Sequence, residues 1–217
     1  MSFEGGLMPR PPFGGRGYVA AKRAFDVAFS LLAVAVCFAP GLLLSAAVYA
    51  DTRAFPIYSQ ERVGKGGKPF RIHKFRTMVA NADEVERFLD KDQLEVWHRE
   101  RKVENDPRVT KLGRILRETS IDEIPNFLDV LAGNMSIVGP RPITEEELQW
   151  FGDDADKLLS VAPGITGWWQ TQSRNDSTFK TGVRQSLELY YVDHACCSFD
   201  LQILFKSVGA VVRKTGR

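Results

Sequence analysis

Cysteine is scarce in this chain, with three residues among 217. Cys37 lies in an apolar stretch, while Cys196 and Cys197 are adjacent, so their spacing supports neither a disulfide framework nor a thiolate metal site. We therefore expect reduced thiols in a cytoplasmic setting. The chain also lacks a nucleic-acid recognition motif, and we expect no nucleic-acid partner despite a formal net charge of +2.

Formal charge is missing altogether from residues 27–50, a stretch long enough to span a bilayer as a helix, for which roughly 20 residues suffice. Basic residues dominate both flanks: Arg10, Arg16, Lys22 and Arg23 before it, and Arg53, Arg62, Lys65, Lys68, Arg71, Lys74 and Arg76 after it. Basic flanks favour the cytoplasmic side of a membrane, so a straight span would leave one of them on the wrong side.

Pro40 and Gly41 interrupt the middle of this stretch. Proline removes a backbone donor and clashes with the carbonyl one turn earlier, so we expect a re-entrant helix hairpin broken at Pro40, with both ends on the cytoplasmic face. That geometry requires partners for the freed carbonyls near Val36. A straight spanning helix that contains a proline and an apolar core helix of a soluble domain remain alternatives.

The predicted fold class is helix-dominated α+β, in three parts. We expect a disordered arm at 1–17, the re-entrant membrane helix at 18–53, and a compact cytosolic catalytic domain at 54–217. In that domain, residues 56–63 and 68–76 read as the strands of a small β-hairpin. Amphipathic helices should lie at the lipid interface, although the apolar face of 201–212 fits a core helix equally well.

The carboxylate pair Asp122-Glu123 carries the predicted chemistry. Pro125 is tolerated only in the first turn of a helix, so we expect a helix to begin at 120–122 and to place both carboxylates at its N-terminus. The helix dipole there should lower a carboxylate pKa and attract phosphate, and an ionised Asp can attack phosphorus. The competing interpretation is a capping box between Ser120 and Glu123, without any chemistry.

Cations for phosphate binding occur nearby in the sequence. Two prolines flank Arg141 and fix its backbone, which suits phosphate recognition. The other candidates for a diphosphate site are Lys74, Arg76, Arg108, Arg114 and Arg117. Each of these alone is more often a solvated surface charge.

Several ordered blocks together resemble the bacterial sugar transferases, the monotopic phosphoglycosyl transferases. The blocks are Lys22-Arg-Ala-Phe-Asp26, Gln60-Glu-Arg-Val-Gly64, Lys74-Phe-Arg-Thr-Met78, Asp106-Pro-Arg-Val-Thr110, Ser120-Ile-Asp-Glu-Ile-Pro125, Met135-Ser-Ile-Val-Gly-Pro-Arg-Pro142, Pro163-Gly-Ile-Thr-Gly-Trp168 and Leu189-Tyr-Tyr191. The run Arg174-Asn-Asp176 and the short N-terminus resemble the small branch that initiates exopolysaccharides. Ala39 departs from the family, which usually has serine before the helix-breaking proline.

The resemblance implies transfer of a sugar 1-phosphate from a nucleotide sugar, usually a UDP sugar, to undecaprenyl (polyprenol) phosphate, at the cytoplasmic face of the bacterial inner membrane. It implies Mg²⁺, Asp122 as the nucleophile that forms a covalent phosphosugar intermediate, and Glu123 as its partner and metal neighbour. Donor, acceptor and membrane lipid would be the partners, and a homo-oligomer stays open. The alternative function is a catalytically silent membrane scaffold that recruits later glycosyltransferases.

Overall fold

The computed structural model describes residues 15–100, 103–172 and 181–212. Its helices and strands, in chain order, are α1 (Gly15–Thr52), β1 (Ile57–Val63), η1 (Lys65–Gly67), β2 (Pro69–Phe75), α2 (Val85–Phe88), α3 (Lys91–Glu100), α4 (Lys111–Thr119), η2 (Ile121–Glu123), α5 (Asn126–Leu131), β3 (Ser136–Val138), α6 (Glu145–Leu148), η3 (Gln149–Asp154), α7 (Ala155–Leu158), β4 (Gly164–Thr166), α8 (Trp168–Gln172), α9 (Val183–His194) and α10 (Cys197–Val212). The predicted helix-dominated α+β class is confirmed.

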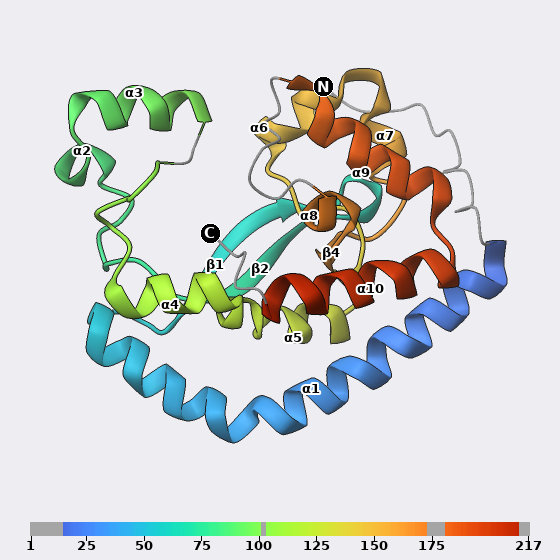
Figure 1. Ribbon diagram of the computed structural model, residues 1–217, viewed down its shortest axis with the longest axis horizontal. Helices are drawn as coiled ribbons and strands as arrows, with labels where there is room; N and C mark the ends of the chain where they lie inside the picture. Colours follow the sequence, from blue (N-terminus) through green and yellow to red (C-terminus); the bar gives the residue numbers. More distant parts are fainter. Residues whose placement is uncertain (1–14, 101–102, 173–180, 213–217) are drawn as a thin grey trace.

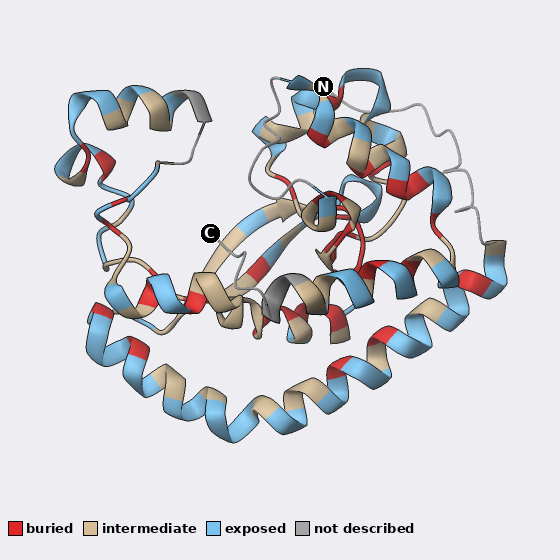
Figure 2. Ribbon diagram, viewed as in Figure 1, coloured by how far each residue is buried: buried red, intermediate tan, exposed pale blue. Residues whose placement is uncertain are grey.

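Helix α1 forms an arch beneath the rest of the molecule, and both of its ends curve back toward the domain (Figure 1). Near one end Tyr18 packs into the main hydrophobic core, and near the other Val48 packs with Phe75 and Leu116. Between these ends the helix exposes most of its large apolar side chains, and Leu43 there is 76% exposed. In Figure 2 the middle of the arch is accordingly pale blue and tan.

The exposure of α1 decides against one of the alternatives. Only 6% of its most apolar 18-residue window is buried, so α1 is not a core helix of a soluble domain. Pro40 lies inside the helix, which continues through it as one element and is not interrupted there. The structure thus gives a bent helix where the sequence suggested a break. Residues 1–14 of the expected arm lie outside the described residues, and α1 begins at Gly15.

The expected hairpin is present as the antiparallel pair β1 and β2, with Ile57 opposite Phe75 and Val63 opposite Pro69. A second sheet, which the sequence analysis did not foresee, pairs β3 with β4 in parallel. It brings Gly164 so close to Gly139 that a Cβ at Gly164 would collide with the Gly139 backbone. This close approach requires glycine and fixes the loop that follows β3.

Charged residues near the start of α1 bind three separate parts of the domain. The Lys22 ammonium contacts the Asp200 carboxylate of α10 at 2.8 Å. Arg23 donates to the Val130 and Leu131 carbonyls at the C-terminal end of α5, at 2.6 and 2.9 Å. Buried Asp26 accepts the Ile137 amide of β3 at 3.0 Å. These contacts hold α5, and with it the segment that precedes α5, at a fixed place relative to the apolar helix.

Candidate active site

The carboxylate pair lies on a short 3₁₀ turn between α4 and α5, and not on the first turn of a single helix. Ser120 ends α4 in the left-handed conformation, with φ of 56°, the turn η2 holds Asp122 and Glu123, and α5 begins only at Asn126 after Pro125. A helical turn thus begins at Ile121, within the predicted 120–122 and with both acids in it, but it is a 3₁₀ turn, and the α-helix itself begins only at Asn126. Proline at the N-cap of α5 supplies no amide donor, and the chain turns before it.

The capping-box interpretation of the pair is not supported either. Ser120 makes no side-chain cap hydrogen bond at η2, and the Glu123 carboxylate instead accepts a bond from the Lys74 ammonium at 2.7 Å. A true capping box occurs elsewhere, between Thr144 and Glu147 at the start of α6. Glu123 is thus directed toward a cation on strand β2.

Burial and the neighbouring Glu123 charge raise the pKa of Asp122 to about 6, against the opposing influence of Lys74 and Arg117. The expected lowering of this pKa by a helix dipole was wrong, because partial burial and the Glu123 charge raise it. A carboxylate with a raised pKa is a stronger base and nucleophile once ionised, and at neutral pH it is still mostly ionised.

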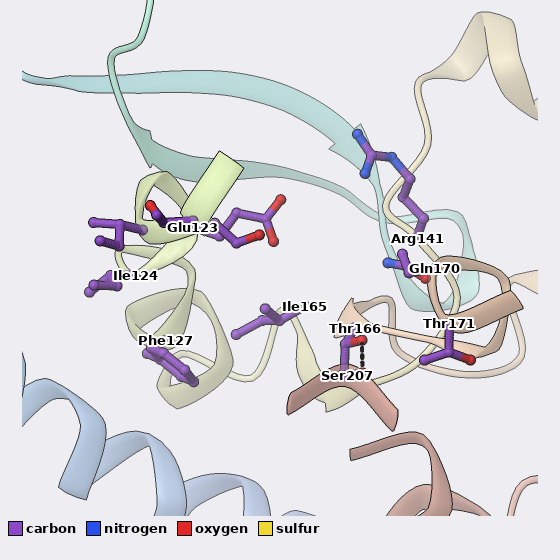
Figure 3. Close-up of a pocket in the computed structure, with 12 residues that line it drawn as sticks. Glu123, Ile124, Phe127, Arg141, Ile165, Thr166, Gln170, Thr171 and Ser207 are labelled. Atoms are coloured by element: carbon purple, nitrogen blue, oxygen red, sulfur yellow. Dashed lines mark hydrogen bonds between the residues drawn. The ribbon is translucent and has the colours of Figure 1, made fainter. Parts of the chain in front are cut away.

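A cavity of about 300 Å³ opens beside Glu123. Figure 3 shows Glu123 on one wall and Arg141 on the other, with Ile165 between them and Thr166, Gln170, Thr171 and Ser207 toward the far end. The Thr166 and Ser207 hydroxyls are 2.6 Å apart, which ties β4 to α10 along this wall. The cavity is therefore built from segments far apart in the sequence.

Arg141 is held by its backbone as well as by its prolines. Its amide donates to both carboxylate oxygens of Glu188, at 3.2 and 3.3 Å, and Gly164 donates to the Pro140 carbonyl at 2.7 Å. Burial raises the pKa of Glu188 to about 7, although Arg184 and Arg141 favour its ionised form. Sequence analysis missed Glu188, whose signal was an acid between Leu187 and Leu189 in an otherwise apolar stretch.

The structure sorts the other predicted cations into two groups. Arg117 lies near enough to Asp122 to influence its charge, and Arg117 Nε donates to the Thr77 hydroxyl at 2.9 Å. Arg76 instead donates to the Phe55 carbonyl at 2.9 Å. Arg108 is buried against Asp106, with its other donor on the Ala82 carbonyl at 3.0 Å. Neither Arg76 nor Arg108 lines the cavity.

Among the described residues no group of three or more His, Cys, Asp or Glu side chains could form a metal site. The adjacent carboxylates of Asp122 and Glu123 nevertheless fit Mg²⁺, which is commonly held by one or two carboxylates together with substrate phosphates. The raised pKa of Asp122, caused in part by Glu123, is the mark of two acids that share one small volume. A bound cation would relieve that repulsion.

The chain is similar to a family of known proteins over nearly its whole length. The family model described as "Bacterial sugar transferase" matches residues 17–214. The exopolysaccharide production protein ExoY of Rhizobium meliloti is 39% identical over 208 residues, which cover 94% of this chain and 89% of that protein. The run Arg174-Asn-Asp176, part of the resemblance, lies outside the described residues.

Two further relatives differ in length. The undecaprenyl-phosphate galactose phosphotransferase of Salmonella typhimurium is 40% identical over 198 residues, or 90% of this chain but 41% of that protein. A UDP-galactose-lipid carrier transferase of Erwinia amylovora is 38% identical, again over 90% of this chain and 41% of the relative. The chain thus spans about two fifths of the length of these transferases and nearly all of ExoY.

Proposed function

The chain belongs to the bacterial sugar transferases, and from that premise we propose that it transfers a sugar 1-phosphate from a nucleotide sugar to undecaprenyl phosphate. We propose a UDP sugar as the donor. The observation that carries the proposal is the pair Asp122-Glu123 on η2: burial and Glu123 raise the pKa of Asp122 to about 6, and Glu123 lines a cavity together with Arg141. The names of the Salmonella and Erwinia relatives support a lipid carrier as acceptor.

In the first step the Asp122 carboxylate attacks the phosphorus that bears the sugar. The new bond joins an Asp122 oxygen to that phosphorus, and the bond to the nucleoside monophosphate breaks, with its electron pair leaving on the departing phosphate. Lys74, Arg117 and Arg141 are the cations close to this centre, and they would stabilise the charge that develops on the phosphate oxygens.

In the second step a phosphate oxygen of the lipid acceptor attacks the same phosphorus and displaces Asp122. The product is a polyprenyl diphosphate sugar, and the carboxylate is restored. The first step needs the Asp122 carboxylate ionised, and the second releases it as a carboxylate. Both steps need the phosphorus held in line, which the fixed backbone of Arg141 and the anchoring of α5 by Arg23 would favour.

Asp122 and Glu123 are the residues that would hold Mg²⁺ in this scheme. The ion, when bound, supplies charge neutralisation for a diphosphate approached by an anionic nucleophile. Lys74 already compensates Glu123 at 2.7 Å, so the metal and Lys74 would share that carboxylate or compete for it.

We propose that α1 lies in the bacterial inner membrane as a re-entrant arch, with the catalytic domain on the cytoplasmic face. The packing of Tyr18 and Val48, near opposite ends of α1, onto the same domain supports this, because a helix tied to one domain at both ends cannot place its ends on opposite sides of a bilayer. Single cysteines at Lys65 and at Arg16, in a chain without Cys37, Cys196 and Cys197, should both resist an impermeant thiol reagent in intact cells. Labelling of only one of them from outside would establish a straight span.

The function is tested with the purified protein in lipid nanodiscs, incubated with a panel of nucleotide sugars, undecaprenyl phosphate and Mg²⁺. We expect one or a few donors to release nucleoside monophosphate and to give a polyprenyl diphosphate sugar. A protein that forms neither product with any donor, but is folded and membrane-bound, would act as a scaffold instead.

A further inference from the structure

The cavity beside Glu123 has two unlike walls. One carries hydroxyl and amide groups, from Thr166, Gln170, Thr171 and Ser207. The other lies near the start of α5, where the apolar side chains of Ile124 and Phe127 lie below Glu123 and toward Ile165 (Figure 3); Ile121 is a further apolar lining residue. An apolar wall of this kind can bury the hydrocarbon part of a ligand.

The apolar wall is continuous with the apolar helix. The Phe127 ring lies 6.0 Å from the Phe29 ring of α1, and the Phe29 ring lies 5.7 Å from that of Phe25. Both α1 rings are about two-fifths exposed, at 42% for Phe29 and 40% for Phe25. A row of aromatic side chains thus leads from the exposed face of α1 to the cavity that holds Glu123.

We propose that the wall formed by Ile124, Phe127 and Ile165, continued by Phe29 on α1, binds the isoprene units next to the phosphate of the polyprenol acceptor. The inference rests on the proposed function and adds to it the place of the lipid. Of the two substrates only the acceptor is both apolar and anchored in the bilayer, and it must bring a phosphate to Asp122 while its chain stays in contact with lipid. Burial of apolar surface against these side chains would favour that position.

This assignment separates the two steps of the reaction. The acceptor takes part only after the phosphosugar has formed on Asp122, so the apolar wall should matter for the second step and not for the first. A merely structural role for Phe127 would disturb both steps, because the same α5 segment follows the carboxylate pair.

The test compares Phe127→Ser with Leu128→Ser in nanodiscs. Leu128 is the next residue on α5, is 55% exposed and does not line the cavity, so it controls for the loss of an apolar side chain from this helix; Phe127 also packs against the main core, and the first step of the reaction reports on that structural effect. The first step is followed as release of nucleoside monophosphate in a single turnover without acceptor, and the second as kcat/KM for undecaprenyl phosphate.

We expect Phe127→Ser to lower kcat/KM for the acceptor by about tenfold, the scale of one partly buried aromatic side chain, and to change the first step by less than about twofold. With farnesyl phosphate as the acceptor, kcat/KM should fall by the same factor in the Phe127→Ser variant, because the wall contacts only the isoprene units nearest the phosphate. Equal loss in both steps, no loss in the second, or an equal loss in Leu128→Ser would overturn the inference.

A second measurement uses the unaltered protein and does not depend on catalysis. A polyprenyl phosphate with a diazirine in its first isoprene units should, on irradiation, label peptides that contain 121–127 or 165. Labelling confined to α10, or to parts of α1 away from Phe29, would contradict the assignment. If the label falls on the wall but no donor releases nucleoside monophosphate, the lipid site stands and the proposed function fails.

Discussion

Two clusters of acidic and basic side chains differ in how completely their charges are matched. Asp106 and Arg108 are both buried, and the guanidinium donates at 2.9 Å to one carboxylate oxygen and at 2.6 Å to the other. Lys74 and Arg117 both act on the charge of Asp122, and Lys74 forms a close ion pair with the neighbouring Glu123, at 2.7 Å.

The pKa values record this difference. Burial alone would raise the pKa of Asp106, but hydrogen bonds from the Arg108 side chain and backbone hold it below its usual value. Burial and Glu123 raise the pKa of Asp122 to about 6, and the cations do not reverse this. A matched pair supports the fold, whereas an acid whose charge is only partly compensated, next to a residue that lines a cavity, is a candidate for chemistry.

The largest expected effect comes from Asp122→Asn. The amide keeps the size of the side chain but cannot form a bond to phosphorus, so turnover should fall by about four orders of magnitude or more, with the fold and membrane association kept. Steady-state release of nucleoside monophosphate measures this. More than a few per cent of activity in a preparation checked for deamidation would show that another group attacks.

Removal of metal should have the next largest effect. With excess chelator we expect turnover to fall by about a hundredfold or more, and added Mg²⁺ to restore it, because Lys74, Arg117 and Arg141 leave much of the charge of a diphosphate and two carboxylates uncompensated. Coupled detection of nucleoside monophosphate gives the rates. Full activity in excess chelator would show that the reaction needs no Mg²⁺ and that Glu123 has no role in binding a metal.

Asp106→Asn probes the matched cluster. It leaves the buried Arg108 charge without its partner, and the free energy of unfolding should fall by about 3 kcal/mol. The stabilisation by ionised Asp106 is present above its unfolded pKa and is lost as the pH falls through its lower folded value, so the difference between variant and unaltered protein should shrink in acid. Denaturation at pH 7 and in acid measures this, while the first-step rate constant of the folded fraction should stay within about threefold.

The smallest expected effect is a shift in a pH profile. The first step needs ionised Asp122, so its rate should rise with pH through about 6 and then level off. Glu123→Gln removes the negative neighbour that helps to raise this pKa, so the rise should move to lower pH, with a reduced plateau. Single-turnover rates from pH 4.5 to 8 test it, and a rise at unchanged or higher pH would contradict the electrostatic explanation.

The sequence predicted the parts of the fold that depend on local pattern. Two strand-like segments joined by a glycine-rich turn predicted the β1–β2 hairpin, and the length of the apolar stretch predicted α1. The short parallel pair of β3 and β4 was not predicted, because strands of three residues carry almost no periodic signal and their pairing depends on contacts between residues far apart in the chain. Helix α1 bends and is not interrupted at Pro40, and both of its ends pack onto the domain. A local sequence pattern does not predict such long-range packing.

For the site, the sequence pointed to Asp122, Glu123, Lys74 and Arg141. Of these, Glu123 and Arg141 line one cavity, Lys74 donates to Glu123, and Asp122 is the neighbour of Glu123 on η2 and does not line the cavity itself. It could not sort Arg108 from Arg141, since both follow a proline in a basic context and differ only in whether a carboxylate occupies the guanidinium. The direction of the Asp122 pKa was missed for a similar reason. Burial and a neighbouring charge are properties of the folded chain, and they outweighed the helix terminus that the pattern suggested.

The central claim is that Asp122 becomes covalently bound to the sugar phosphate. The most direct measurement is mass spectrometry of the protein quenched in acid after one turnover with donor and without acceptor, followed by digestion and sequencing of the peptide that contains 118–129. The account predicts an added sugar phosphate on Asp122, which disappears when undecaprenyl phosphate is supplied before the quench. An adduct on any other residue, or stoichiometric release of nucleoside monophosphate with no adduct, would contradict it.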